Sequence, residues 1–329
     1  MSLPPGSARD VSPVRLGTWP TPVEPAPRLA AALGLGADDL LVKRDDLTGL
    51  GAGGNKLRKL EWTVAEALAD GADTLVTTGA PQSNHARLTA AVAARLGLRA
   101  VLVFPGAPGA SRTGNLVLDA VLGAEIVFTG VTGRPALNQA AAQVVERLRA
   151  AGARPALLPF GGSSVLAARG YVAAAEELLA QVPDLHTVVV ALGSGATMAG
   201  LVARLGSERV LGVHVGAVED PRAVVASFAA GLGASAPAEG LRVDDEQVGP
   251  GYGSLTEPVR EALSLAARRE GIILDPTYTG RAMAGLIAAA RRGEIRPGRR
   301  TVLLHTGGVP GLYGHAAALT WADSIPPAG

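Results

Sequence analysis

Two lysines follow a glycine-rich stretch near the start of the chain. Residues 51–55 are Gly-Ala-Gly-Gly-Asn, and Lys56 and Lys59 come soon after them. Because residues three apart share one face of a helix, both amines would lie together where a helix begins. One amine could bond covalently to a carbonyl cofactor while the other meets an anion beside the free N–H groups of the helix start. A helix start with solvated lysines explains the same residues without a ligand.

A phosphate-binding Walker A loop is the obvious alternative for this stretch, but it requires serine or threonine directly after the lysine. Leu57 stands at that position. The motif is therefore absent.

A run of polar residues, Gln-Ser-Asn-His at 82–85, follows the next expected strand. Ser83 or Asn84 suits the N-cap of a helix, which accounts for one of the four residues but not for the others. Exposed donors at this turn could bind a substrate carboxylate or a cofactor hydroxyl group. His85, taken alone, is more often a structural histidine than a base.

A second glycine-rich turn follows a buried strand at residues 193–197, which are Gly-Ser-Gly-Ala-Thr. Loop amides and the start of a helix near Thr197 would surround a phosphate group. The glycine spacing does not fit a dinucleotide motif, so a single phosphate is the better match. A glycine-rich turn without any ligand explains the turn equally well.

Three later segments place polar residues in expected loops. Tyr252 stands among glycines and a proline, in a chain with only 4 tyrosines, and helix or strand packing does not explain it there. A functional loop residue is a reasonable interpretation. Tyr278 and Thr279 belong to Asp-Pro-Thr-Tyr-Thr-Gly-Arg at 275–281, and Thr306 to Leu-His-Thr-Gly-Gly at 304–308. Either segment could also be an ordinary loop or strand end.

These motifs require a scaffold in which strands and helices alternate. Short β-branched runs predict strands at residues 40–43, 74–77, 100–104, 125–128, 187–191, 210–215 and 301–305. Helical patterns predict helices at 56–69, 85–96, 115–122, 135–150, 168–179, 197–205, 257–269 and 281–292. This alternation indicates an α/β fold with parallel sheets. Ligands in such folds lie at the carboxyl ends of the strands, where the glycine-rich turns fall.

Composition narrows the class of protein. At roughly 100–200 residues per domain, the 329 residues suggest two domains. A net charge of +1 gives no strong attraction to nucleic acid or membranes. The absence of cysteine excludes disulfides, thiolate metal sites and a cysteine nucleophile. No uncharged apolar run reaches the roughly 18 residues of a membrane span, so a cytoplasmic enzyme or binding protein is expected, without a metal.

The motifs, taken in order, resemble those of the fold-type II pyridoxal-phosphate (PLP) enzymes. The order is Gly-Gly-Asn-Lys, Gln-Ser-Asn-His, Gly-Ser-Gly-Ala-Thr, Asp-Pro-Thr-Tyr-Thr-Gly and His-Thr-Gly-Gly. The most similar group is the D-cysteine desulfhydrase / 1-aminocyclopropane-1-carboxylate (ACC) deaminase family. The resemblance runs from near Pro20 to the C-terminus. It implies a tryptophan synthase β-like fold with two domains, each containing an open, twisted, mostly parallel sheet flanked by helices.

The same resemblance assigns roles to residues. Lys56 would hold PLP as a Schiff base and move the substrate proton, with Ser83, Tyr252 and Tyr278 as further catalytic residues. The cofactor phosphate is expected at Lys59, Gly193, Ser194, Gly195, Ala196 and Thr197, and the rest of the cofactor at Asn84, Thr279 and Thr306. The substrate is expected to contact Ser83, Asn84, His85, Tyr252 and Tyr278.

The resemblance also implies an arrangement of domains. A large PLP-binding domain would comprise residues 1–58 and 164–329, and a smaller inserted α/β domain residues 59–163. Members of the family are commonly homodimers, so a homodimer is expected.

Two positions bear on the substrate. In the deaminase of that family a glutamate pairs with the pyridine nitrogen where this chain has Thr279, and a leucine stands where this chain has Thr306. A threonine hydroxyl favours a protonated ring nitrogen less than a carboxylate does, which suits β-elimination better than opening of a cyclopropane ring. We therefore expect a lyase that converts D-cysteine to pyruvate, ammonia and sulfide.

Alternatives remain open at this point. An L-cysteate sulfo-lyase would need a cation or donors near the sulfonate, which Arg112, Thr113 or His85 could supply, and ACC deaminase is the other relative. Other fold-type II activities, such as threonine dehydratase, usually have different residues around the lysine. A non-catalytic protein that binds a phosphate ligand is the alternative outside enzymes.

Overall fold

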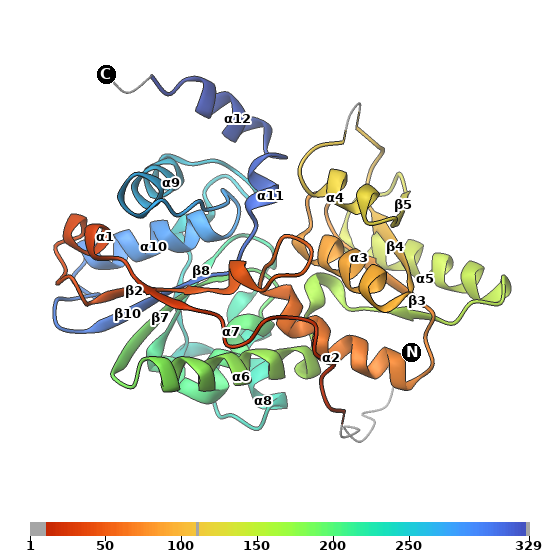
Figure 1. The fold of residues 1–329 in the computed structure, drawn as a ribbon, viewed down its shortest axis with the longest axis horizontal. Helices are drawn as coiled ribbons and strands as arrows, with labels where there is room; N and C mark the ends of the chain where they lie inside the picture. Colours follow the sequence, from red (N-terminus) through yellow and green to blue (C-terminus); the bar gives the residue numbers. More distant parts are fainter. Residues whose placement is uncertain (1–10, 110–111, 327–329) are drawn as a thin grey trace.

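The computed structural model describes residues 11–109 and 112–326, which form two sheets (Figure 1). The six-stranded sheet has the order β1-β2-β10-β7-β8-β9, and the four-stranded sheet the order β5-β4-β3-β6. The strands of the larger sheet are β1 (Val23–Pro25), β2 (Leu40–Arg44), β7 (Leu185–Leu192), β8 (Val210–His214), β9 (Arg242–Asp244) and β10 (Arg300–His305). Those of the smaller sheet are β3 (Thr74–Thr78), β4 (Arg99–Phe104), β5 (Glu125–Phe128) and β6 (Pro155–Leu157).

Every strand pairing is parallel except that of β1 with β2. Parallel strands need both faces covered, because their connections place helices on each side. Helices α6 (Val165–Gln181), α7 (Ala196–Leu205) and α8 (Pro221–Gly231) cover one face of the larger sheet. Helices α1 (Pro27–Ala32), α9 (Glu257–Glu270) and α10 (Thr279–Arg291) cover the other. In β7, Val188 and Val190 point to the first group and Val189 to the second, as the two-residue period of a strand requires.

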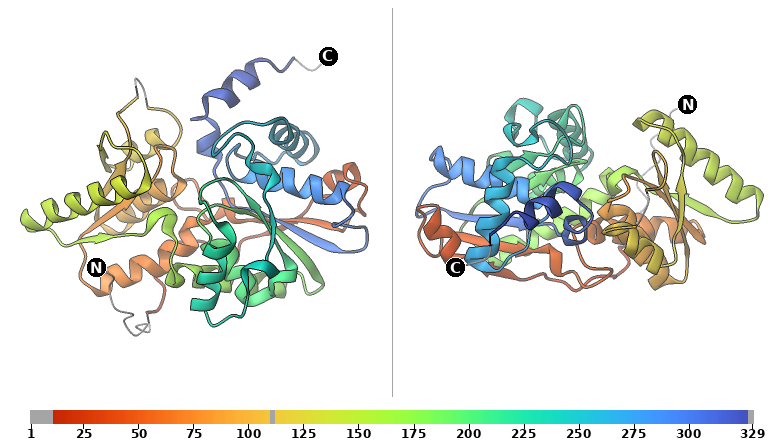
Figure 2. Two further views of the ribbon diagram at one scale, coloured as in Figure 1. Left: turned by 180° about the vertical axis from the view of Figure 1, so that it is seen from behind. Right: turned by 90° about the horizontal axis from the view of Figure 1, so that it is seen from above.

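The smaller sheet is built in the same way. Helix α5 (Arg134–Ala150) packs on one face, against Val76, Val101 and Val103. Helices α2 (Lys56–Ala69), α3 (Asn84–Leu96) and α4 (Asn115–Val121) belong to the core on the other face. Figure 2 shows the two sheets and their helices as lobes that lie side by side.

The seven expected strands and eight expected helices are all present, with bounds shifted by three residues at most. Strands β1, β6 and β9 were not expected, since three residues are too few to show a period. Helices α1 and α8 were also missed, although Asp220 before Pro221 of α8 is a regular helix start and its carboxylate accepts a hydrogen bond from Ala223 N. The short helices α11 (Val309–Leu312) and α12 (Ala316–Asp323) complete the chain. No helix in the described ranges has the length and apolar character to cross a membrane.

Two segments of the chain connect the two sheets. Residues 48–55 lead from β2 into α2, and residues 154–164 contain β6 and a 3-10 turn, Phe160–Gly162, before α6 begins. Contacts across this junction bring the strand ends together: Asn55 N donates to Thr306 O (3.0 Å), and its Nδ2 donates to Thr197 Oγ1 (3.2 Å). The turns that carry the sequence motifs therefore meet between the two sheets.

Candidate active site

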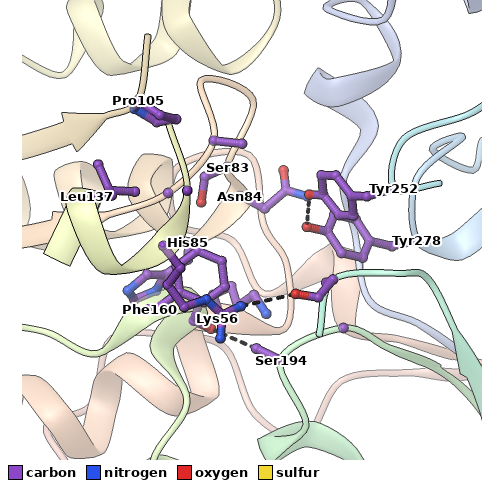
Figure 3. A pocket seen from close by; sticks show the side chains of 17 residues that line it. Lys56, Ser83, Asn84, His85, Pro105, Leu137, Phe160, Ser194, Tyr252 and Tyr278 are labelled. Atoms are coloured by element: carbon purple, nitrogen blue, oxygen red, sulfur yellow. Dashed lines mark hydrogen bonds between the residues drawn. The ribbon is translucent and has the colours of Figure 1, made fainter. Parts of the chain in front are cut away.

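A cavity of about 280 Å³ opens between the lobes (Figure 3). A smaller inner cavity adjoins it, and the two share Lys56, Asn84, Gly193, Ser194 and Tyr278 in their walls. Residues from both lobes supply the lining of the outer cavity, which also includes Ser83, His85, Pro105, Arg134, Leu137, Phe160 and Tyr252. The inner cavity also contains Asn55, Gly195, Thr197 and Thr306 in its lining.

The chain has only three lysines. Lys56 lines both cavities, and Lys59 lies next to it, outside both linings. Lys43 is paired with Glu177 (3.0 Å), away from the site. Lys56 and Lys59 contact one another, and in the described part of the chain neither has a carboxylate within ion-pair distance. Burial lowers the pKa of Lys56 to about 8, against a smaller opposing effect of its hydrogen bond with Lys59. Burial and the neighbouring Lys56 amine lower the pKa of Lys59 well below its usual value.

A buried ion network fixes the helix that carries both amines. Arg58, between the two lysines in sequence, donates from Nε and Nη2 to the carboxylate of Asp45 (2.9 Å each) and from Nη1 to Glu177 (2.9 Å). Trp19 stacks on its guanidinium at 4.1 Å, and Tyr171 donates to Asp45 (2.6 Å). Because these partners lie on the 3-10 turn after β2 (Asp45–Leu47), on α6 and on the N-terminal segment, α2 is held in one rotation about its axis. The lysines on its cavity face are thereby held in place.

The glycine-rich stretch before Lys56 makes a backbone path that other residues could not follow. Gly53 has φ +68°, and a Cβ there would lie 1.8 Å from Asp46 O. A side chain at Gly53 would therefore push the stretch away from the 3-10 turn that follows β2 and displace the start of α2.

The turn after β7 lies near Lys59 and has the features of an anion-binding site. Gly195 has φ +94° and precedes α7 without a side-chain cap, so the first N–H groups of α7 remain for a ligand. Ser194 Oγ and Ser163 Oγ are 2.7 Å apart, and Lys59 Nζ donates to Ser163 Oγ (3.3 Å). A helix start and the buried amine of Lys59, which has no carboxylate partner among the described residues, fit the phosphate of PLP. Ser163 was not expected here, although it follows the Gly161-Gly162 pair that the sequence marks as a turn.

The polar turn after β3 is also part of the wall. Ser83 is the N-cap of α3, and its Oγ accepts a hydrogen bond from Ala86 N (3.2 Å). Its hydroxyl hydrogen stays available as a donor, and Ser83, Asn84 and His85 all line the cavity. The N-cap role that the sequence predicts for Ser83 or Asn84 thus belongs to Ser83.

His85 is buried, and neither ring nitrogen has a hydrogen-bond partner among the described residues. Burial, with smaller effects of the two lysines, lowers the pKa of His85 well below its usual value, so its ring is neutral at pH 7. Gly162 leaves room for the ring, since a Cβ there would lie 2.8 Å from Nδ1. His85 is consequently a neutral hydrogen-bonding group for a ligand and not a cation.

The two expected active-site tyrosines come together at the cavity (Figure 3). Their hydroxyl groups are 2.5 Å apart, and the rings are at 70° to each other. Asp275 holds the loop of Tyr278 by accepting hydrogen bonds from Thr277 N and Tyr278 N (2.9 Å each) and Thr279 N (2.8 Å). Burial raises the pKa of both tyrosines, so both are protonated near neutral pH.

The two threonines that bear on the substrate have different surroundings. Thr306 is in the wall of the inner cavity. Thr279 does not line either cavity; its buried hydroxyl donates to Asp275 Oδ1 and accepts from Asp275 N (2.8 Å each). Thr279 therefore supports the loop of Tyr278 from within the protein.

Arg134 is a lining residue that the sequence did not reveal. It begins α5, stacks on the ring of Phe160 (4.2 Å) and donates from Nη2 to Ala217 O (3.1 Å), so it spans the cavity mouth between the lobes. Arg112 and Thr113, the other cation and donor considered, do not line the cavity. The expected residues come from loops next to strand ends, whereas Arg134 sits in a helix start that lacks any motif.

Comparisons with known proteins show which family and fold the chain shares. The sequence profile of a family described as "Pyridoxal-phosphate dependent enzyme" matches residues 14–307. A D-cysteine desulfhydrase of Salmonella choleraesuis (strain SC-B67) is 41% identical over 311 residues, which cover 90% of this chain and 94% of that protein. A crystal structure of an ACC deaminase homologue has a TM-score of 0.85 at 36% identity, over 95% of this chain and 96% of its own.

A more distant structure supports the fold alone. Threonine deaminase isoform 2 from Solanum lycopersicum has a TM-score of 0.62 at 18% identity, covering 88% of this chain and 79% of its own.

Proposed function

Because the chain belongs to the family of pyridoxal-phosphate dependent enzymes, we propose that it is a lyase that converts D-cysteine to pyruvate, ammonia and sulfide. The observation that carries this proposal is the pair Lys56 and Lys59, buried without carboxylate partners in the described chain and facing the turn after β7. The similarity to a D-cysteine desulfhydrase over nine-tenths of the chain supports the choice of substrate.

The residues present suit each part of the cofactor. Lys56 would bond to its aldehyde carbon, and Lys59 with residues 193–197 would bind its phosphate. Asn84 and Thr306, in the inner cavity wall, would meet the ring oxygen and the ring nitrogen. Thr279 would act one step away, through Asp275. When bound, the cofactor withdraws electrons from the Cα of an attached amino acid.

The protein's own groups would then move the protons. The amine of Lys56, with its pKa lowered by burial to about 8, has a substantial neutral fraction near neutral pH and would take the Cα proton. Tyr252 and Tyr278 keep their hydroxyl protons, because burial raises the pKa of both, and would donate to the leaving sulfur. Ser83 would donate its hydroxyl hydrogen to the substrate, since its oxygen already accepts from Ala86 N.

Turnover of a substrate panel tests this function. We expect pyruvate from D-cysteine and from β-chloro-D-alanine, and 2-oxobutyrate from ACC at a rate at least about a hundredfold lower, because neither Thr279 nor Thr306 supplies a carboxylate to the ring nitrogen. Product release is measured for all substrates on the same preparation. ACC turnover that matches D-cysteine turnover would show that this use of the threonines is mistaken.

One observation favours a second substrate, L-cysteate. Among the described residues that line the outer cavity, Arg134 carries the only guanidinium, and its partners there are a carbonyl group and an aromatic ring, both neutral. An acidic β-substituent such as a sulfonate would find a cation at the mouth. Histidine cannot supply it, since His85 is neutral.

Arg134→Leu separates the two substrates. We expect kcat/KM for L-cysteate to fall about tenfold, the value of one charge-assisted contact in a partly exposed place, with a change of less than about twofold for D-cysteine. Arg112→Leu, on the exposed loop outside the cavity lining, is the matched control. An equal loss on both substrates would assign Arg134 to closure of the mouth and not to recognition of an anion.

Three further points belong to the proposal. The larger lobe would be a PLP-binding domain of residues 1–58 and 164–329, with 59–163 as the inserted domain; the four-stranded sheet lies within the insertion.

A homodimer would cover the exposed apolar side chains of Tyr313 and Leu319 near the C-terminus. A cytoplasmic location would suit a chain without cysteine.

A further inference from the structure

The amide of Asn84 is held in one orientation by two buried residues. Its Oδ1 accepts hydrogen bonds from Asn115 Nδ2 (2.9 Å) and Arg87 Nη2 (3.3 Å). Asn84 also lines both cavities, and Figure 3 shows it among the residues of the outer one. Since the amide oxygen is engaged by two donors, the NH2 group is the part of Asn84 that is left for a ligand.

Asn115 cannot turn its own amide over to reverse this arrangement. Its Nδ2 donates to the backbone oxygen of Gln82 (2.8 Å) as well as to Asn84, and its Oδ1 accepts from Arg87 Nε (3.2 Å). A reversed amide would place an oxygen against two acceptors and an NH2 group against the donor of Arg87. Asn115 is fully buried, so water would not compensate for these losses.

Arg87 fixes the other end of the chain of hydrogen bonds. It is fully buried, and its Nη1 donates to the backbone oxygens of Gly51 and Gly53 (2.7 Å to the second). Burial lowers the pKa of Arg87 to about 10, which leaves it charged and a donor only at neutral pH. The same guanidinium thus orients Asn84 and holds the glycine-rich stretch that leads to Lys56.

We propose that Asn115 and Arg87 are positioning residues that fix Asn84 as a hydrogen-bond donor to the ring oxygen of the cofactor. The direction of every bond in this chain follows from groups that cannot change role: the Gln82 carbonyl accepts, and the Arg87 guanidinium donates. A donor at the ring oxygen favours its ionised form, which a carbonyl oxygen in the same place would disfavour. The inference rests on the proposed function, because it requires PLP in this cavity.

Asn115→Asp is the sharpest test, since it keeps the shape of the side chain and removes its donors. Only the longer hydrogen bond from Arg87 Nη2 (3.3 Å) then opposes a turn of the Asn84 amide, so Asn84 is expected to turn its NH2 group toward the new carboxylate and its oxygen toward the cavity. We expect the dissociation constant of PLP to rise about tenfold and the visible band of the bound cofactor to shift, because one buried donor to an anionic oxygen is lost. Both quantities are measured by titration of the cofactor-free protein, followed by absorbance.

Three further variants distinguish a positioning role of Asn115 from a general structural effect. Gln82→Ala removes two hydrogen bonds of the same loop, to Asn115 N and Thr113 O (2.9 Å each), and leaves the amide of Asn115 intact. Gln82→Ala should leave the visible band of the bound cofactor unchanged. In an Asn84→Ala background, Asn115→Asp should change PLP affinity by less than about twofold, since the residue through which it acts is gone. Arg87→Lys, which keeps the charge and loses the forked donors, should shift the band in the same direction and covers the case in which Asn115→Asp does not fold.

The results that would overturn the inference differ from the result that would overturn the proposed function. An unchanged band and affinity in Asn115→Asp, a shift of equal size in Gln82→Ala, or the same loss of affinity with and without Asn84 would each overturn the inference. Absence of PLP binding by the unmodified protein would instead overturn the proposed function.

Discussion

Lys56→Ala is expected to remove the visible absorption of the cofactor-loaded protein and to lower β-elimination by at least about a thousandfold. The variant loses both the covalent bond to the cofactor and the base that takes the Cα proton, and general base catalysis alone contributes about a hundred- to ten-thousandfold. Absorbance after incubation with PLP and pyruvate release from D-cysteine are the measurements. The fold should persist, because α2 is held by Arg58 and its partners and not by Lys56.

The small number of lysines makes the covalent assignment unusually direct. Borohydride reduction of the loaded protein should place the cofactor mass on one peptide, and only three lysines, Lys43, Lys56 and Lys59, are candidates. We expect the label on Lys56 alone. Label on Lys59 would reverse the roles of the two amines, and a colourless protein that takes up no PLP would support a non-catalytic phosphate-binding protein instead.

The fold could be predicted from the sequence wherever a pattern is long enough to repeat. Buried strands such as β7 and amphipathic helices such as α2 run for several periods, and both were predicted with bounds near those observed. The three-residue strands β1, β6 and β9 exist because a longer neighbour offers hydrogen bonds at its edge, as β2 does for β1. The reason that these three residues form a strand therefore lies in the partner strand and not in their own sequence.

The site residues likewise fall into those that the sequence predicts and those that it does not. Lys56, Asn84 and Tyr278 stand in unusual local sequences at the ends of elements, and the structure places all three in the cavity wall. Ser163, Arg134 and the buried pair Arg87 and Asn115 lie in sequences that are ordinary for a loop or helix. Their roles come from tertiary contacts, such as that of Ser163 with Ser194, which no spacing along the chain predicts. Thr279 shows the converse, because a residue expected at the cofactor has its hydroxyl bound to Asp275.

Lys59→Met should have opposite effects on the cofactor-free protein and on cofactor binding. Methionine fills a similar volume without charge, so the variant no longer buries an amine beside Lys56. We expect the free energy of unfolding of the cofactor-free protein to rise by about 1–2 kcal/mol at pH 7. Affinity for PLP should fall by about a hundredfold, since a charged donor to the phosphate is lost.

The effect of Lys59→Met on the free energy of unfolding should depend on pH in a direction that can be measured. The pKa of Lys59 in the folded protein is lowered well below 10.5, mainly by burial, so the unfolded chain binds this proton more readily. Stability of the unmodified cofactor-free protein is therefore lost as pH falls from 10.5 toward the lowered pKa. The advantage of Lys59→Met should accordingly be larger at pH 7 than at pH 9.5, as measured by denaturant unfolding.

Lys43→Met is the matched control, because Lys43 is as deeply buried as Lys59 but is paired with Glu177 (3.0 Å) and donates to Thr21 O (2.8 Å). Its replacement should lower the free energy of unfolding by about 2 kcal/mol, since the acceptors Thr21 O and Gln181 Oε1 lose their donor, while Glu177 keeps Arg58 as its cation. Opposite signs for the two variants would show that Lys59 is an amine kept for an anion that the protein does not itself supply. If both variants destabilise the cofactor-free protein equally, Lys59 has a structural role and the phosphate must be bound by the turn after β7 alone.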